Sequence, residues 1–185
     1  SVGVVASVLG IVPVVVLAIN FFSTLSVDGG WGRSWNSTTL RFVAVGIVSF
    51  LLFGILAAVF STRDLSATLA FTSFAEGQVQ LLTYGAATMI LFGASYFILP
   101  RLTGSLWPSS KLVHVHFWSA FLGLLIAVGA ALVGGWQAGQ QLATPSVSAA
   151  QVAAQSAPWA LAGSLAALLV LVGHVAFALN AFGMI

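Results

Sequence analysis

Residues 77–104 read GQVQLLTYGAATMILFGASYFILPRLTG, and residues 77–99 of this stretch form an apolar run without a charged side chain. A helix of about 20 apolar residues is long enough to cross the hydrocarbon core of a bilayer, which is about 30 Å thick. Four further runs of this kind occupy residues 2–25, 42–60, 112–135 and 159–182. We therefore expect an all-α membrane protein, a bundle of five transmembrane helices in a single transmembrane domain over residues 1–185.

The composition excludes a protein whose whole surface faces water. Of the 185 residues, 60% are hydrophobic and 4% are charged, whereas about 25% are charged in a typical soluble domain. Five Lys and Arg against three Asp and Glu are too few for the phosphate contacts that nucleic-acid binding needs, so we expect no nucleic-acid partner. Because the chain has no cysteine, it can form no disulfide and no thiolate metal site.

The basic side chains indicate an orientation. The connections on one side of the membrane hold Arg33, Arg41, Arg101 and Lys111, and the opposite side holds Arg63. Cytoplasmic connections carry an excess of Lys and Arg. We therefore expect the N-terminus outside and the C-terminus in the cytoplasm.

Small residues mark the faces through which the helices are expected to pack. Without a hydrophobic driving force between helices in lipid, small side chains let two backbones approach closely. In the last three runs the predicted packing positions are Gly85, Gly93, Gly123, Gly129 and Gly163.

The histidines are the first candidates for chemistry. At 3.6 residues per turn, His114 and His116 point about 200° apart on a helix, so they cannot hold one metal ion, although each could serve a different haem. Because they directly follow Lys111, we interpret both as side chains at the membrane edge. His174 lies deeper in its run, and we interpret it as hydrogen-bonded to a neighbouring helix.

Other polar side chains begin the third run. Glu76 stands where a helix dipole stabilises a carboxylate, so we interpret it as part of the helix cap. Gln78 and Gln80 are interpreted as hydrogen-bonding groups in helix packing. No run of polar residues joins Glu76 to His174 in the sequence, so proton conduction is not predicted, and no inverted repeat suggests a transporter.

The residues quoted first also resemble a known family. Residues 77–104 closely resemble the tenth helix and following loop of the catalytic subunit of cytochrome cbb-type (C-family) haem-copper oxidases, in which the helix opens with G-H-x-H and ends in a Tyr-Phe-x-x-Pro-Arg-Leu-like segment. The neighbouring runs are similar to the eighth, ninth, eleventh and twelfth helices through Asn20-Phe21-Phe22, Leu40-Arg41-Phe42, His116-Phe117-Trp118 and Gly173-His174. The resemblance implies that the chain is the C-terminal half of that subunit, the last five of twelve helices.

The resemblance changes the meaning of two amides. In the family, the two histidines of G-H-x-H bind different haems, and Gln78 and Gln80 stand at these positions. An amide oxygen is a weak ligand for haem iron, and the amide nitrogen has no free lone pair to give. The resemblance therefore implies no catalytic residue, no metal and no cofactor in this chain, with haem b and copper in a partner chain.

The predicted function is a haem-free accessory or structural membrane subunit of a bacterial respiratory complex similar to cytochrome cbb-type oxidase. Its expected partners are other membrane subunits of that complex, with lipid or a quinone. The expected location is the bacterial inner membrane, with the N-terminus in the periplasm. The alternative is part of an active terminal oxidase or nitric oxide reductase, taking part in electron transfer to oxygen or nitric oxide through an unusual haem ligand such as Gln78, Gln80, His114, His116 or His174.

Overall fold

A computed structural model describes residues 2–27 and 29–184, with their side chains except those of residues 2–4, 6–8, 31, 33 and 34. Arg33, on which the predicted orientation partly depends, has its side chain outside the described residues. Five helices in the described chain are long and apolar enough to cross a membrane. They are α1 (Val2–Ser26), α3 (Thr38–Val59), the continuous helix Ser73–Thr103, α7 (Ser110–Leu142) and α8 (Ala149–Phe182). The predicted all-α bundle of five long apolar helices is confirmed.

The helices begin where the sequence supplies a capping oxygen. The side chains of Ser37, Thr72 and Ser109 accept the backbone N–H groups of Leu40, Phe74 and Leu112 at the starts of α3, α5 and α7. Ser148 and Gln151 form a reciprocal capping box at the start of α8. Such side chains satisfy backbone donors that a helix leaves without a partner at its N-terminus.

The last two helices are longer than predicted. Residues 136–158 were expected to connect them, yet α7 continues to Leu142 and α8 already begins at Ala149. Ala and Gln, which are frequent in this stretch, are strong helix formers, and hydropathy marks the hydrocarbon core rather than the ends of a helix. Two short helices, α2 (Gly30–Asn36) and α4 (Arg63–Leu69), also occupy the first two connections.

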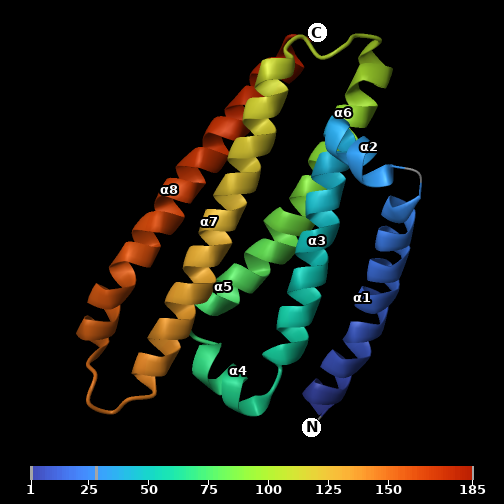
Figure 1. Ribbon diagram of the computed structural model, residues 1–185. Coiled ribbons are helices and arrows are strands. Elements are labelled where there is room, and N and C mark those ends of the chain that lie inside the picture. The colour runs from blue at the N-terminus through green and yellow to red at the C-terminus, as the bar shows by residue number, and fades with distance from the viewer. Residues whose placement is uncertain (1, 28, 185) are drawn as a thin grey trace.

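Figure 1 shows α7 and α8 as an antiparallel pair along one side of the bundle, with α1 at the opposite edge against α3. Between them lies the third long helix, which consists of α5 (Ser73–Gln80), η1 (Leu81–Thr88) and α6 (Met89–Thr103). Its α5 end packs on α7 and its α6 end packs on α3, so this helix crosses the bundle obliquely. Its middle is thereby placed in the core, where Met89 and Tyr96 are buried with Phe42 and Phe117.

Three of the predicted packing glycines lie at close helix contacts. A Cβ built on Gly85 would come within 2.8 Å of the Ser49 side chain, and one on Gly93 within 2.9 Å of the Thr39 carbonyl oxygen. Gly123 faces α8 in the same way, since a Cβ there would lie 3.0 Å from the carbonyl oxygen of Ala166.

The prediction is wrong for Gly129 and Gly163. A Cβ on either glycine would meet nothing within 4 Å. Both residues line open grooves instead of helix contacts, Gly129 between α3 and α7 and Gly163 between α5 and α8. Sequence composition identifies small residues, but it does not tell a close contact from a groove.

Candidate functional site

The side chain of His116 lies inside the bundle. It is 0% exposed, and its Nδ1 is 2.9 Å from the hydroxyl oxygen of Tyr96 on α6. Its Nε2 is buried without a hydrogen-bond partner among the described residues. The ring is enclosed because the C-terminal ends of α6 and α8 cover the first turns of α7.

His174 forms a second pair of the same kind. Its Nε2 lies 3.2 Å from the hydroxyl oxygen of Tyr84, which confirms the predicted hydrogen bond to a neighbouring helix. The ring centroids of His174 and His116 are 6.0 Å apart. The chain has two tyrosines, and each of them meets a histidine at this cluster.

Aromatic rings surround the two histidines. The centroid of Phe92 lies 4.4 Å from that of His116 and 5.3 Å from that of His174, and Phe177 and Phe42 lie 5.1 Å and 5.0 Å from His116. These rings enclose the imidazole of His116, whereas that of His174 is half-buried. We call Tyr84, His174, His116 and Tyr96 the Tyr–His cluster.

A stretch of π-helix positions Tyr84 in this cluster. Within η1 the backbone follows the wider π pattern, and the hydroxyl of Thr88 donates to the carbonyl oxygen of Thr83 at 2.9 Å. π-Helical turns are rare and occur frequently at functional sites. Here the turn lies beside the close contact of Gly85 with Ser49, where the third helix passes from α7 to α3.

His114 is separate from the cluster. Its side chain is exposed, and its Nδ1 lies 2.8 Å from the carbonyl oxygen of Ser110 one turn earlier. The two histidines of the His-x-His pair therefore point in different directions, as the helical geometry predicts, and the structure does not bring them together.

Gln78 and Gln80 have different surroundings. The Nε2 atom of Gln78 is buried without a hydrogen-bond partner among the described residues. Gln80 lines a groove of about 410 Å³ between α5, α7 and α8, and the walls of this groove also include Ser73 and Glu76. It also lines a second groove of about 260 Å³ that reaches Tyr84. Gln80 therefore has open space beside it.

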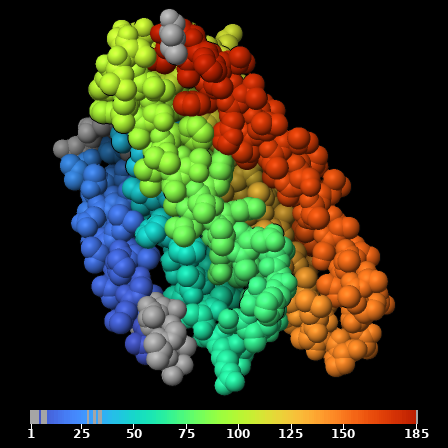
Figure 2. All heavy atoms as spheres, turned by 180° about the vertical axis from the view of Figure 1, so that it is seen from behind, coloured from blue at the N-terminus to red at the C-terminus, as the bar shows by residue number. Residues whose placement is uncertain are grey.

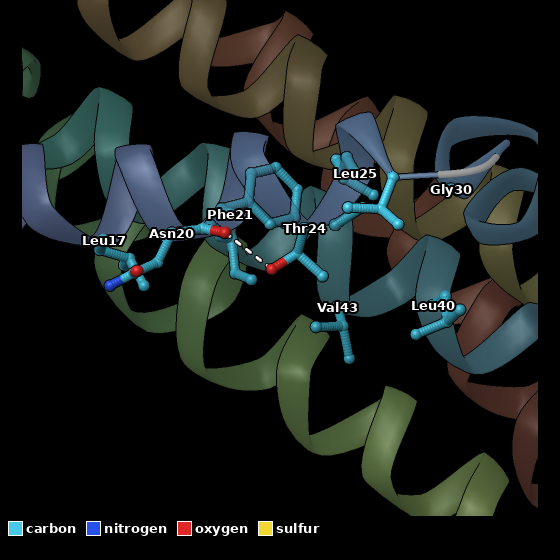
Figure 3. Close-up of a pocket in the computed structure, with 11 residues that line it drawn as sticks. Leu17, Asn20, Phe21, Thr24, Leu25, Gly30, Leu40 and Val43 are labelled. Atoms are coloured by element: carbon cyan, nitrogen blue, oxygen red, sulfur yellow. Dashed lines mark hydrogen bonds between the residues drawn. The ribbon is translucent and has the colours of Figure 1, made fainter.

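Two other grooves are mainly apolar. Figure 3 shows a pocket of about 670 Å³ between α1 and α3, where the hydroxyl of Thr24 donates to the carbonyl oxygen of Asn20 at 2.8 Å. Another groove, of about 580 Å³, lies between α3 and α7 and is lined almost wholly by apolar side chains such as Leu52 and Leu125. Such surfaces suit acyl chains or helices rather than a polar substrate.

The described residues do not fit a haem or copper ion well. They contain no group of three His, Cys, Asp or Glu side chains that could hold a metal ion. At the positions that the resemblance assigns to haem ligands, the donors are the two amides Gln78 and Gln80. A neutral imidazole offers iron a nitrogen lone pair and an amide does not, so these two positions are poor ligands for haem iron.

The fold and the cluster define a class: a multi-pass helical membrane protein with one buried and one half-buried histidine, each linked to a tyrosine. The family described as "Cytochrome C and Quinol oxidase polypeptide I" matches residues 1–169. The chain belongs to this family.

Individual relatives agree with this assignment. The chain is 33% identical over 138 residues to cytochrome c oxidase subunit 1 of Rhodobacter capsulatus, a match that covers 70% of this chain and 26% of the relative. It is 27% identical over 113 residues to cytochrome c oxidase polypeptide 1 of Halobacterium salinarum, covering 60% of this chain and 18% of the relative. It is 26% identical over 136 residues to the Cbb3-type cytochrome c oxidase subunit CcoN1 of Stutzerimonas stutzeri, covering 73% of this chain and 28% of the relative. The matches thus span 18% to 28% of the length of these relatives.

A solved structure shares the fold. The structure of a heme-copper terminal oxidase dimer superposes with a TM-score of 0.63 at 16% sequence identity, covering 87% of this chain and 28% of that one. The five long helices are therefore arranged as a part of an oxidase subunit I.

Proposed function

We propose that this chain is a haem-free accessory or structural membrane subunit of a bacterial respiratory complex of the cytochrome cbb-type. In this proposal it derives from an oxidase catalytic subunit and keeps the helix packing of that subunit without its redox groups. Haem b and copper belong to a partner chain, which carries out the reduction of oxygen.

One observation carries the proposal: amides stand where the resemblance places both haem-binding histidines. Gln78 keeps a buried amide nitrogen without a partner, and Gln80 presents a neutral amide to a groove. The close contacts at Gly85, Gly93 and Gly123 meanwhile support a bundle whose packing does not need haem.

A second candidate function is supported by the groove beside Gln80. Its volume of about 410 Å³ and its small-residue walls provide room for part of a flat ring next to this position. In that case the chain takes part in electron transfer to oxygen or nitric oxide, as part of an active terminal oxidase or nitric oxide reductase, with Gln80 as an unusual ligand.

Optical spectra of the tagged full chain, purified from its native membranes with its partners, separate the two candidates. We expect the Soret band to be unchanged by Gln78→Leu or Gln80→Leu, as it is in the control variant Gln137→Leu on α7. A shift or loss of the band in Gln80→Leu alone would support the second candidate and contradict the first.

The proposed partners are other membrane subunits of the complex, with lipid or a quinone. The apolar groove between α3 and α7 offers a surface for a partner helix or an acyl chain. A quinone carbonyl has a possible donor in the Gln80 amide. Mass spectrometry of the purified material tests the subunit role: we expect oxidase subunits that carry haem, whereas a monodisperse chain that purifies alone contradicts it.

The proposed location is the bacterial inner membrane, with the N-terminus in the periplasm and the C-terminus in the cytoplasm. Because the chain has no cysteine, Ser105→Cys and Ser146→Cys place single thiols in the α6–α7 and α7–α8 connections. We expect a membrane-impermeant thiol reagent to label Ser146→Cys in cells with a permeable outer membrane and to leave Ser105→Cys unlabelled. The reverse pattern contradicts the orientation.

A further inference from the structure

Gln80 and Tyr84 lie along the third helix between Glu76 and His174, although the sequence predicts no polar connection there. Gln80 lies in the wall of both grooves between α5, α7 and α8, one of which contains Glu76 and the other Tyr84. Figure 2 shows the green third helix meeting the red end of α8 and separating from its orange part, where α7 is visible between them. Gln80 therefore lies between the groove at Glu76 and the groove at Tyr84.

The connection continues from Tyr84 through the Tyr–His cluster. The hydroxyl oxygen of Tyr84 is 3.2 Å from Nε2 of His174, and Nδ1 of His116 is 2.9 Å from the hydroxyl oxygen of Tyr96. Each of these groups can accept one proton and release another. Along the third helix, Glu76 and Tyr96 are 20 residues apart, or roughly 30 Å at 1.5 Å per residue, which is the thickness of the hydrocarbon core.

The Nε2 atom of His116 is buried in the cluster without a hydrogen-bond partner among the described residues. The ring of His116 is 0% exposed, and a buried polar atom without a partner is costly. If Nδ1 carries the proton and donates to Tyr96, Nε2 holds a lone pair. This nitrogen is then a base that is kept from water and has no hydrogen-bond partner among the described residues.

We propose that Tyr84, His174, His116 and Tyr96 form a proton relay that connects the groove at Glu76 with the end of the bundle at Trp107. A proton from the groove binds the Tyr84 oxygen as the Tyr84 hydroxyl proton passes to Nε2 of His174. His174 then releases its Nδ1 proton to Nε2 of His116, whose Nδ1 proton passes to the Tyr96 oxygen. Tyr96 releases its own hydroxyl proton, so one proton enters and one leaves.

The step between the two histidines limits the relay. Their centroids are 6.0 Å apart, and an imidazole nitrogen lies about 1.1 Å from its ring centre, so the closest possible nitrogen separation is about 3.8 Å, roughly 1 Å beyond a hydrogen bond. A small rotation of either ring or one bridging water closes this distance. The relay is therefore open only when these side chains move.

Trp107 packs against Tyr96, the last residue of the proposed relay. Its ring centroid lies 4.6 Å from that of Tyr96, and its indole N–H donates to the Tyr96 carbonyl oxygen at 3.2 Å. Trp107 is partly exposed, so it links the ring of Tyr96 to the surface at this end of the bundle.

Proton flux into vesicles tests the relay without reference to haem. The full chain is reconstituted in phosphatidylcholine vesicles that contain a pH-sensitive dye, and a potassium gradient with valinomycin drives protons inward. We expect acidification faster than in protein-free vesicles, and we expect Tyr84→Phe and His116→Phe to return it to the protein-free rate. His114→Phe, on the exposed side of α7, is the matched control and keeps the original rate.

The proposal is overturned by an unsubstituted chain that conducts no faster than protein-free vesicles, or by relay variants that conduct as fast as the unsubstituted chain. A loss in His114→Phe as well assigns the flux to a disturbed bundle and also overturns it. Tyr84→Phe keeps the aromatic ring, and helical circular dichroism with a single gel-filtration peak verifies that each variant is folded. Because haem content is measured separately, this test and that of the accessory role fail independently.

Discussion

Replacing Tyr96 by Phe removes one hydroxyl from the centre of the bundle and leaves the ring in place. The ring stacks on Phe42 at 5.3 Å and lies 4.6 Å from Trp107, and these contacts remain in the variant. What is lost is the 2.9 Å contact with Nδ1 of His116, which links α6 to α7. Because the other nitrogen of His116 has no partner among the described residues, both ring nitrogens are then unpaired.

The expected loss of stability follows from this burial. Leaving a buried polar group without its partner costs about 1–3 kcal/mol, whereas hydrogen bonds between membrane helices average about 0.6 kcal/mol and reach about 1.7. His116 is 0% exposed, so we expect the loss of unfolding free energy to lie near the upper end of the range for hydrogen bonds between membrane helices. We expect Tyr96→Phe to lower the free energy of unfolding by about 1.5 kcal/mol, and Tyr84→Phe, whose partner is only half-buried, by about 0.5 kcal/mol.

Reversible unfolding in mixed micelles, followed by circular dichroism as the denaturing detergent increases, measures these differences. A double-mutant cycle with Tyr96→Phe and His116→Phe isolates the pair, and we expect a coupling of about 1 kcal/mol. In the matched cycle His114→Phe replaces His116→Phe, and the coupling is within about 0.5 kcal/mol of zero.

The reasoning is refuted if Tyr96→Phe unfolds within about 0.5 kcal/mol of the unsubstituted chain, the ordinary range for a surface substitution. Equal couplings in the two cycles also refute it, since the effect then does not come from the bond to His116.

Three further substitutions test the packing, the caps and the ligand positions. Gly135→Ala places a Cβ on the backbone nitrogen of Phe74, so we expect the free energy of unfolding to fall by about 3 kcal/mol or more in the same assay. In the control Gly129→Ala, where the Cβ meets open space, we expect a fall of less than about 0.5 kcal/mol. Equal effects of the two substitutions contradict the contact at Gly135. Ser148→Ala removes the capping box of α8 and is expected to cost about 1 kcal/mol, and no measurable loss means that the box does not stabilise this helix. Gln80→His places an imidazole beside the groove, and we expect a haem absorption band on this variant after it is separated from its partners; no band contradicts the view that this amide is what excludes haem from the chain.

The number and type of the long helices could be predicted because the thickness of a bilayer sets the length of an apolar run. The ends of these helices could not be predicted in this way, because hydropathy marks the part of a helix that lies in the hydrocarbon core and not the residue at which the helix ends. The Ala- and Gln-rich segment that extends α7 past Trp136 shows this, since its polar side chains leave the hydrocarbon while its backbone stays helical.

The Tyr–His cluster was harder to predict than the fold. Tyr84 and His174 are 90 residues apart in the chain, and Tyr96 and His116 are 20 apart, so their contacts depend on how three helices cross. A sequence pattern shows which residues share one helix face, but not which face meets which. The π-helical turn at Tyr84 changes even that local pattern, because it shifts the residues after it around the helix axis.

The central claim is that this member of the oxidase family keeps the helix packing and has lost haem binding. The ratio of haem to protein in the full chain, separated from its partners, tests this claim directly by the pyridine haemochrome spectrum and amino-acid analysis. The account predicts no b-type haem on the chain. A stoichiometric amount that remains after separation would contradict it.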